Sequence, residues 1–127
     1  MKKDLAGRQD IERLVTVFYS KVKADPVIGF IFTEIAKVNW AAHLPVMFNF
    51  WEYILFSTGP YKGDPMGAHI QLNKKNHLTP AHFDQWKKLF DETVDGLFEG
   101  EKADEAKQRA AQIAGLMLYK IEQVNAR

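Results

Sequence analysis

The sequence contains no cysteine, and this absence removes several kinds of chemistry at once. Without thiols there are no disulfide bonds, no thiolate nucleophile and no cysteine ligands for a metal ion. The GxSxG, HExxH, Walker A and Gly-rich dinucleotide motifs are absent as well. The common hydrolytic and nucleotide-binding arrangements are therefore excluded.

The chain also has a low net charge and no long apolar run. Its net charge is only +1, so it has no basic stripe of the kind that nucleic acids attract. The most apolar stretch, residues 46–56, is interrupted by Asn49 and Glu52, and it is far shorter than the ~20 apolar residues that span a bilayer. The first residues, MKKDLAG, lead into no apolar signal core. We therefore expect no nucleic-acid partner, no membrane span and a cytoplasmic location.

What the chain does have is enough apolar material for a core. Its 127 residues fit one domain, residues 1–127, and 46% of them are hydrophobic. Aromatic residues reach 13%, with nine Phe and three Trp. This aromatic content raises the question of whether some rings line a flat ligand rather than only one another.

Apolar residues recur at helical spacing along the chain, and the alternation typical of strands is missing. The first predicted helix begins near Asp10, a good N-cap, and ends before Asp25. Its apolar face holds Ile11, Leu14, Val15, Phe18 and Val22. Further along, the pattern predicts a short turn over 27–32, helices over 39–56, 66–72, 79–98 and 104–124, a loop over 57–65 and a polar connection over 73–78. We therefore predict an all-α fold.

Pro45 conflicts with a regular helix over 39–56. Inside a helix, proline loses one hydrogen bond and clashes with the carbonyl four residues back, here that of Ala41. It also disfavours helical geometry at Leu44. Either the regular helix begins near Leu44, or its first turns are kinked.

Four histidines are the candidate metal ligands: His43, His69, His77 and His82. A zinc site needs three or four ligands at characteristic spacings, whereas His77 and His82 are five apart with Pro80 between them. Haem needs one neutral imidazole on the iron and an apolar cleft for the macrocycle. His69 in a helical chain meets that demand, although the pattern alone fits an ordinary, partly exposed histidine as well.

Three runs together carry a more specific signal. They are FYSKVKADPVIGFIF at 18–32, NFWEYILFSTGPYKGDPMGAHIQL at 49–72 and HFDQWKKLFDET at 82–93. The chain resembles the truncated haemoglobins, specifically group III, from about Asp10 to Tyr119. The middle run is the most specific, with its FW pair, its TGxYxGxP and a histidine four residues after the proline. The resemblance implies a two-on-two helical sandwich, the truncated globin fold, that binds haem b.

The resemblance also implies roles for single residues. His69 matches the proximal histidine that binds the iron. Tyr19 matches the distal tyrosine, whose hydroxyl can donate to a ligand oxygen that gains negative charge. Trp86 matches the tryptophan of the distal pocket, and its indole N–H can only donate.

The remaining matches concern the pocket walls. Phe32 matches the phenylalanine that stacks on the haem edge, while Met47 and Phe50 match apolar pocket positions. We expect Met47 to be wall rather than an iron ligand. His43 matches the distal histidine position of group III. His77 and His82 match no haem role, so we interpret both as surface residues.

The function implied is reversible binding of dioxygen and other small ligands, such as nitric oxide, carbon monoxide or cyanide. Two alternatives stay open. The first is a haem enzyme that detoxifies nitric oxide, peroxide or nitrite with electrons from a separate reductase. The second is a haem-free helical interaction module whose aromatic residues are ordinary core.

Pro45 generates a testable hypothesis, because it lies two residues after His43. We hypothesise that it leaves His43 on a segment that swings between pocket and solvent and gates the entry of ligands. Pro45→Ala should then change the association rate of carbon monoxide measured by flash photolysis. An unchanged association rate would contradict the hypothesis that His43 gates ligand entry.

Overall fold

A computed structural model describes residues 2–58, 61 and 63–126 of the chain. Over these residues the backbone forms five α-helices and one π-helical segment, and it forms no strand. The all-α prediction is therefore confirmed. In chain order the elements are α1 (Arg8–Ala24), η1 (Ile31–Ile35), α2 (Trp40–Phe56), α3 (Pro65–Lys75), α4 (Pro80–Leu97) and α5 (Glu101–Asn125).

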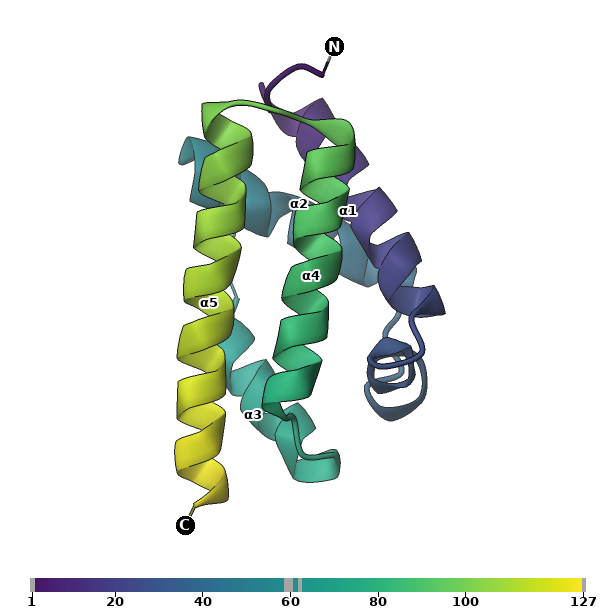
Figure 1. Cartoon of the computed structure of the whole chain (residues 1–127). Coiled ribbons are helices and arrows are strands. Elements are labelled where there is room, and N and C mark those ends of the chain that lie inside the picture. Colours follow the sequence, from purple (N-terminus) through teal and green to yellow (C-terminus); the bar gives the residue numbers. More distant parts are fainter. Residues whose placement is uncertain (1, 59–60, 62, 127) are drawn as a thin grey trace.

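The helices pack as two pairs, with α3 at one end (Figure 1). The long helices α4 and α5 lie side by side and antiparallel, joined by the short turn at 98–100. Helix α1 packs against both α2 and α4, so it connects the two pairs. Helix α3 packs against α5. Across the described part of the chain, no helix combines the length and the apolar character needed to cross a membrane.

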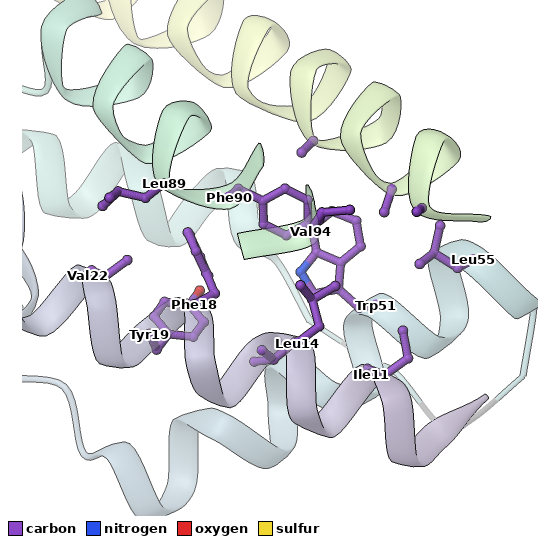
Figure 2. Packing of buried hydrophobic residues seen from close by; sticks show 14 of the residues in the cluster. Ile11, Leu14, Phe18, Tyr19, Val22, Trp51, Leu55, Leu89, Phe90 and Val94 are labelled. Atoms are coloured by element: carbon purple, nitrogen blue, oxygen red, sulfur yellow. The ribbon is translucent and has the colours of Figure 1, made fainter. Parts of the chain in front are cut away.

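The core is built around the ring of Phe90 on α4, which is fully buried. Trp51 of α2 stacks on one side of this ring at a centroid distance of 4.8 Å, and Trp86 stacks on it at 5.6 Å. Phe18 of α1 meets it edge-on at 5.3 Å. Figure 2 shows Phe18, Trp51 and Phe90 converging from three helices. Because each aromatic pair adds ~0.5–1.5 kcal/mol beyond burial, the cluster fixes how α1, α2 and α4 sit together.

Sequence signals that act within one helical turn predicted the local structure well. The apolar face of α1 is buried as expected. Asn39 caps α2, since its side chain accepts a hydrogen bond from the Ala42 N–H at 3.3 Å. At the start of α4, Thr79 Oγ1 accepts from the His82 N–H, and His82 Nδ1 accepts from the Thr79 N–H. This reciprocal pair is a capping box around a first-turn proline.

Some predicted boundaries were wrong. Helix α1 begins at Arg8, and Asp10 lies inside its first turn, where its carboxylate accepts from the Ala6 N–H at 2.9 Å. Helix α3 is longer than the predicted 66–72, because Asp64 caps it through the Gly67 N–H at 3.0 Å and its last residues stay helical. The polar connection therefore shrinks to 76–79. Helix α5 begins at 101 rather than 104.

Of the two alternatives that Pro45 left open for α2, a late start near Leu44 was wrong. The helix begins at Trp40 and continues through Pro45. Pro45 is exposed, and so is Ala41, whose carbonyl loses its helical partner. Since water can hydrate that carbonyl, the missing hydrogen bond costs little and the helix tolerates the proline.

The N-terminal segment caps a distant helix. Asp4 Oδ2 accepts from the Lys102 N–H at 2.9 Å, and Oδ1 accepts from the Ala103 N–H at 2.9 Å. These are orphan donors at the start of α5. Gly100 has a φ of 141°, and a Cβ there would lie 2.5 Å from Asp4 Cγ. Glycine is therefore required where the two segments meet.

We expect Asp4→Ala to lower the free energy of unfolding by about 1–2 kcal/mol at pH 7, as the loss of a helix cap does. Burial opposes ionisation, but backbone hydrogen bonds from Lys102, Ala103 and Leu5 outweigh it and lower the pKa of Asp4. A lowered folded-state pKa stabilises the protein at neutral pH. This contribution is lost as the pH falls below about 4, towards and through the folded-state pKa.

Urea denaturation at pH 7 and at pH 3 measures the effect, which should be large only at pH 7. Asp104→Ala is the control, because it removes an exposed carboxylate from the same helix end and leaves the cap intact. Equal losses in the two variants would contradict the capping role.

Candidate functional site

A cavity of about 320 Å³ lies between the helices, with mostly apolar walls. This volume is in the range of sites that hold small molecules and cofactors. Every residue that the sequence analysis proposed for the site lines it. They are Tyr19, Phe32, His43, Met47, Phe50, His69 and Trp86. All six helical elements contribute side chains to its walls.

His69 projects from α3 with a defined proton position. Its Nδ1 lies 2.6 Å from the carbonyl oxygen of Pro65, one helical turn earlier. A carbonyl only accepts, so Nδ1 carries the proton and Nε2 has a free lone pair. The cap from Asp64 and the first-turn position of Pro65 start α3 at the point that makes this carbonyl available. The imidazole is thus prepared as a metal ligand, with its second nitrogen held by the backbone.

Tyr19 is buried among aromatic rings. Its side chain is 6% exposed, and burial raises its pKa well above the usual value. The phenol therefore stays protonated and acts as a hydrogen-bond donor. Its ring meets the edge of the His43 imidazole at a centroid distance of 5.4 Å. The two side chains form one polar corner of the cavity.

His43 has an unsatisfied atom. Its Nε2 is buried, and no described residue offers it a hydrogen bond. Burial lowers the pKa of His43, and the electrostatic influence of His69 lowers it further, so the His43 ring is neutral at pH 7. An unpaired buried nitrogen costs ~1–3 kcal/mol. It therefore points to a partner that a ligand in the cavity would supply.

Trp40 holds this polar corner in place. Its indole stacks on Phe32 at 6.2 Å, and it approaches Tyr19 at 5.4 Å and His43 at 5.7 Å. The ammonium of Lys23 covers the indole at 4.8 Å. The sequence analysis did not link Trp40 to the site. Its position directly after the Asn39 cap, three residues before His43, is the signal that could have linked it to the site.

The remaining predicted residues form walls. Met47 lies four residues after His43, and Phe50 lies three residues after Met47, so the three side chains share one face of α2. Trp86 is fixed by stacking on Phe90 and by an edge contact with Phe18 at 5.5 Å. Its ring belongs both to the core and to the cavity wall.

Sequence analysis missed some lining residues. His82 was interpreted as a surface residue, and that interpretation was wrong: it is half-buried and lines the cavity. Its place three residues after a strong N-cap signal could have shown that α4 brings it inward. Ile113 and Met117 also line the cavity, and their spacing of four residues puts them on one face of α5. His77 is exposed.

These features fit haem. An apolar cavity accepts a flat macrocycle, the free Nε2 of His69 can bind iron, and the orphaned Nε2 of His43 lies where a ligand would meet it. Among the described residues, no group of three or more histidine and carboxylate side chains could hold a metal ion. An all-α fold around such a cavity defines a globin.

Comparison with known proteins agrees with this class. The chain is 32% identical over 126 residues to the group 3 truncated haemoglobin of Campylobacter jejuni, covering 94% of this chain and 97% of the relative. It is 33% identical over 103 residues to a group 1 truncated haemoglobin of Chlamydomonas moewusii, covering 79% of this chain but only 57% of that longer protein. No family model matches the chain.

The fold agrees as well. The crystal structure of the group III truncated haemoglobin from Campylobacter jejuni superposes with a TM-score of 0.83, 29% identity and 95% coverage of both chains. The chain therefore belongs to the truncated haemoglobin family, in group III. Its two helix pairs, α1 with α2 and α4 with α5, form the two-on-two sandwich that the sequence predicts.

Proposed function

We propose that this chain binds haem b through His69 and takes up dioxygen and other small ligands, such as nitric oxide, carbon monoxide and cyanide, on the opposite side. One observation carries the proposal. The Nδ1–H of His69 donates to the Pro65 carbonyl at 2.6 Å, which leaves Nε2 as a free ligand in an apolar cavity. Membership of the haemoglobin family supports the same cofactor.

On the proximal side, the protein orients one imidazole. Bound haem would supply an iron coordination position for a small ligand, and His69 would hold that iron. The bond to Pro65 fixes the tautomer of His69 and makes Nε2 more electron-rich. The apolar side chains of Phe32, Met47 and Phe50 exclude water from the faces of the macrocycle.

On the distal side, the protein offers hydrogen-bond donors. The phenol of Tyr19 stays protonated because burial raises its pKa, and the indole of Trp86 can only donate. Each donor would stabilise a partly negative ligand oxygen by roughly 1–3 kcal/mol. Such contacts slow release more than they speed capture. Slow release suits sensing or chemistry better than bulk transport.

The proximal assignment predicts the effect of His69→Ala. Purified wild-type protein mixed with hemin should show a strong haem absorption band, and the variant should show an altered band or none. His77→Ala is the matched control, because His77 is exposed. If His69→Ala leaves the band unchanged, the iron ligand lies elsewhere and His43 is tested next. No band in the wild type would remove the haem function.

The distal assignment predicts the effects of Tyr19→Phe and Trp86→Phe. Each variant keeps an aromatic ring and loses one donor, so dioxygen should dissociate about 5- to 150-fold faster. Carbon monoxide, which gains little negative charge, should change much less. Stopped-flow kinetics give both rates, with Tyr53→Phe at an exposed tyrosine as the control. Equal changes for the two gases would indicate altered packing and contradict the donor role.

A further inference from the structure

His82 stands at the rim of the cavity. It is half-buried, it lines the cavity, and its ring meets the edge of Phe30 at a centroid distance of 6.4 Å. Phe30 is itself 36% exposed, so this pair lies where the cavity approaches the surface. The distal donors and His69 do not account for a polar ring at this place.

The imidazole of His82 is held in one orientation. Its Nδ1 accepts from the Thr79 backbone N–H at 3.1 Å, and the backbone N–H of His82 donates to Thr79 Oγ1 at 3.4 Å. Since a backbone N–H only donates, Nδ1 is unprotonated and the ring proton is on Nε2. The capping box therefore leaves one directed donor, Nε2–H.

The other titratable side chains that line the cavity have different surroundings. Tyr19, His43 and His69 flank the cavity from α1, α2 and α3. Asp64 is itself an anion that caps α3, and its charge helps to raise the pKa of the neighbouring Tyr61. A second carboxylate would be repelled there. At the edge of the cavity, His82 is a hydrogen-bond donor. Among the described residues, neither its contacts nor its pKa shift indicates a carboxylate beside it.

Haem is an apolar plate with two propionate carboxylates on one edge. Carboxylates are costly to bury without donors, so that edge faces the place where the cavity meets solvent and finds an N–H. We propose that Nε2–H of His82 donates a hydrogen bond to one haem propionate. This inference rests on the proposed function and extends it, since it assigns a binding role to a residue outside both the proximal and the distal sets. The positive end of the α4 dipole favours the same carboxylate.

The contact anchors the cofactor by its polar edge. Hydrogen bonds to ionised acceptors are stronger than neutral ones, although partial exposure weakens them. Removing the donor should therefore increase the rate of haem loss by about 3- to 10-fold. The effect should depend on the carboxylate charge, which separates it from any effect on folding.

His82→Phe tests the proposal, because phenylalanine keeps an aromatic ring at the rim and carries no N–H donor, and the change that it makes to the capping box acts on haem and on its ester alike. Transfer of cofactor to an excess of a haem-scavenging apoglobin is measured for haem and for its dimethyl ester, whose propionates carry no charge. Haem should leave the variant about 3- to 10-fold faster than the wild type, as estimated above for a partly exposed charge-assisted bond. The ester should leave both proteins at the same rate.

Two further variants make the outcome decisive. His77→Gln changes an exposed histidine and should leave both rates unchanged, while Tyr61→Phe tests the other rim donor. Equal acceleration of haem and ester in His82→Phe overturns the proposal, since it would show a role in folding only. Unchanged rates in the His82 variant also overturn it. So does a Tyr61→Phe variant that loses haem faster but loses the ester at the wild-type rate. A wild-type protein without a haem band would overturn the proposed function and this inference together.

Discussion

The stack of Trp51, Phe90 and Trp86 is the contact on which the rest of the structure depends. Trp51 of α2 stacks on Phe90 of α4 at a centroid distance of 4.8 Å and so holds these two helices together. Trp86, also on α4, stacks on Phe90 at 5.6 Å, and Phe18 of α1 meets the ring of Phe90 edge-on. Trp51 and Trp86 also line the cavity. The rigid core and the site therefore share a wall, and the stack determines how far apart the helices stand beside it. A chain of this size needs such a wall, because ordinary apolar side chains would collapse into the space.

An open apolar cavity is expensive for a small protein. Lining atoms lose contacts at a cost of ~24 cal/mol per Å³ of cavity, and the buried Nε2 of His43 adds an unpaired polar group. A cofactor that binds only the folded state returns this free energy by mass action. The protein without haem should thus be less stable than the complex, and the residues that weaken the empty fold are those that recognise the ligand. The same residues therefore lower the free energy of unfolding of the empty protein and contribute to haem binding.

The sequence predicted the structural features whose causes lie within a turn or two. The apolar face of α1, the Asn39 cap and the Thr79–Pro80 start were all visible as spacing or as cap residues. The Asp4 cap of α5 was not, because its partners are 98 and 99 positions away. Within the site, the resemblance to the truncated haemoglobins selected residues that all line one cavity. The resemblance did not identify the carbonyl that accepts from His69, and it did not show that His82 lines the cavity. Both depend on the residue at which a helix begins and on the position of that residue relative to the cavity.

Two of the polar groups at the cavity are set by helix starts. Asp64 and Pro65 begin α3 so that the carbonyl of Pro65 is in place for His69, and the Thr79 capping box of α4 fixes the ring of His82. The first turn of a helix always has unpaired backbone donors, so side chains gather there for stability alone. When such an end lies beside a cavity, the side chain that satisfies the backbone also gains a fixed orientation. The contacts that stabilise the start of the helix then also hold a side chain in the orientation that binds the cofactor, so no further side-chain entropy is lost on binding. For this reason, a histidine held in a capping box makes a better rim donor than a free one on the surface, whose rotamers would have to be restricted on binding.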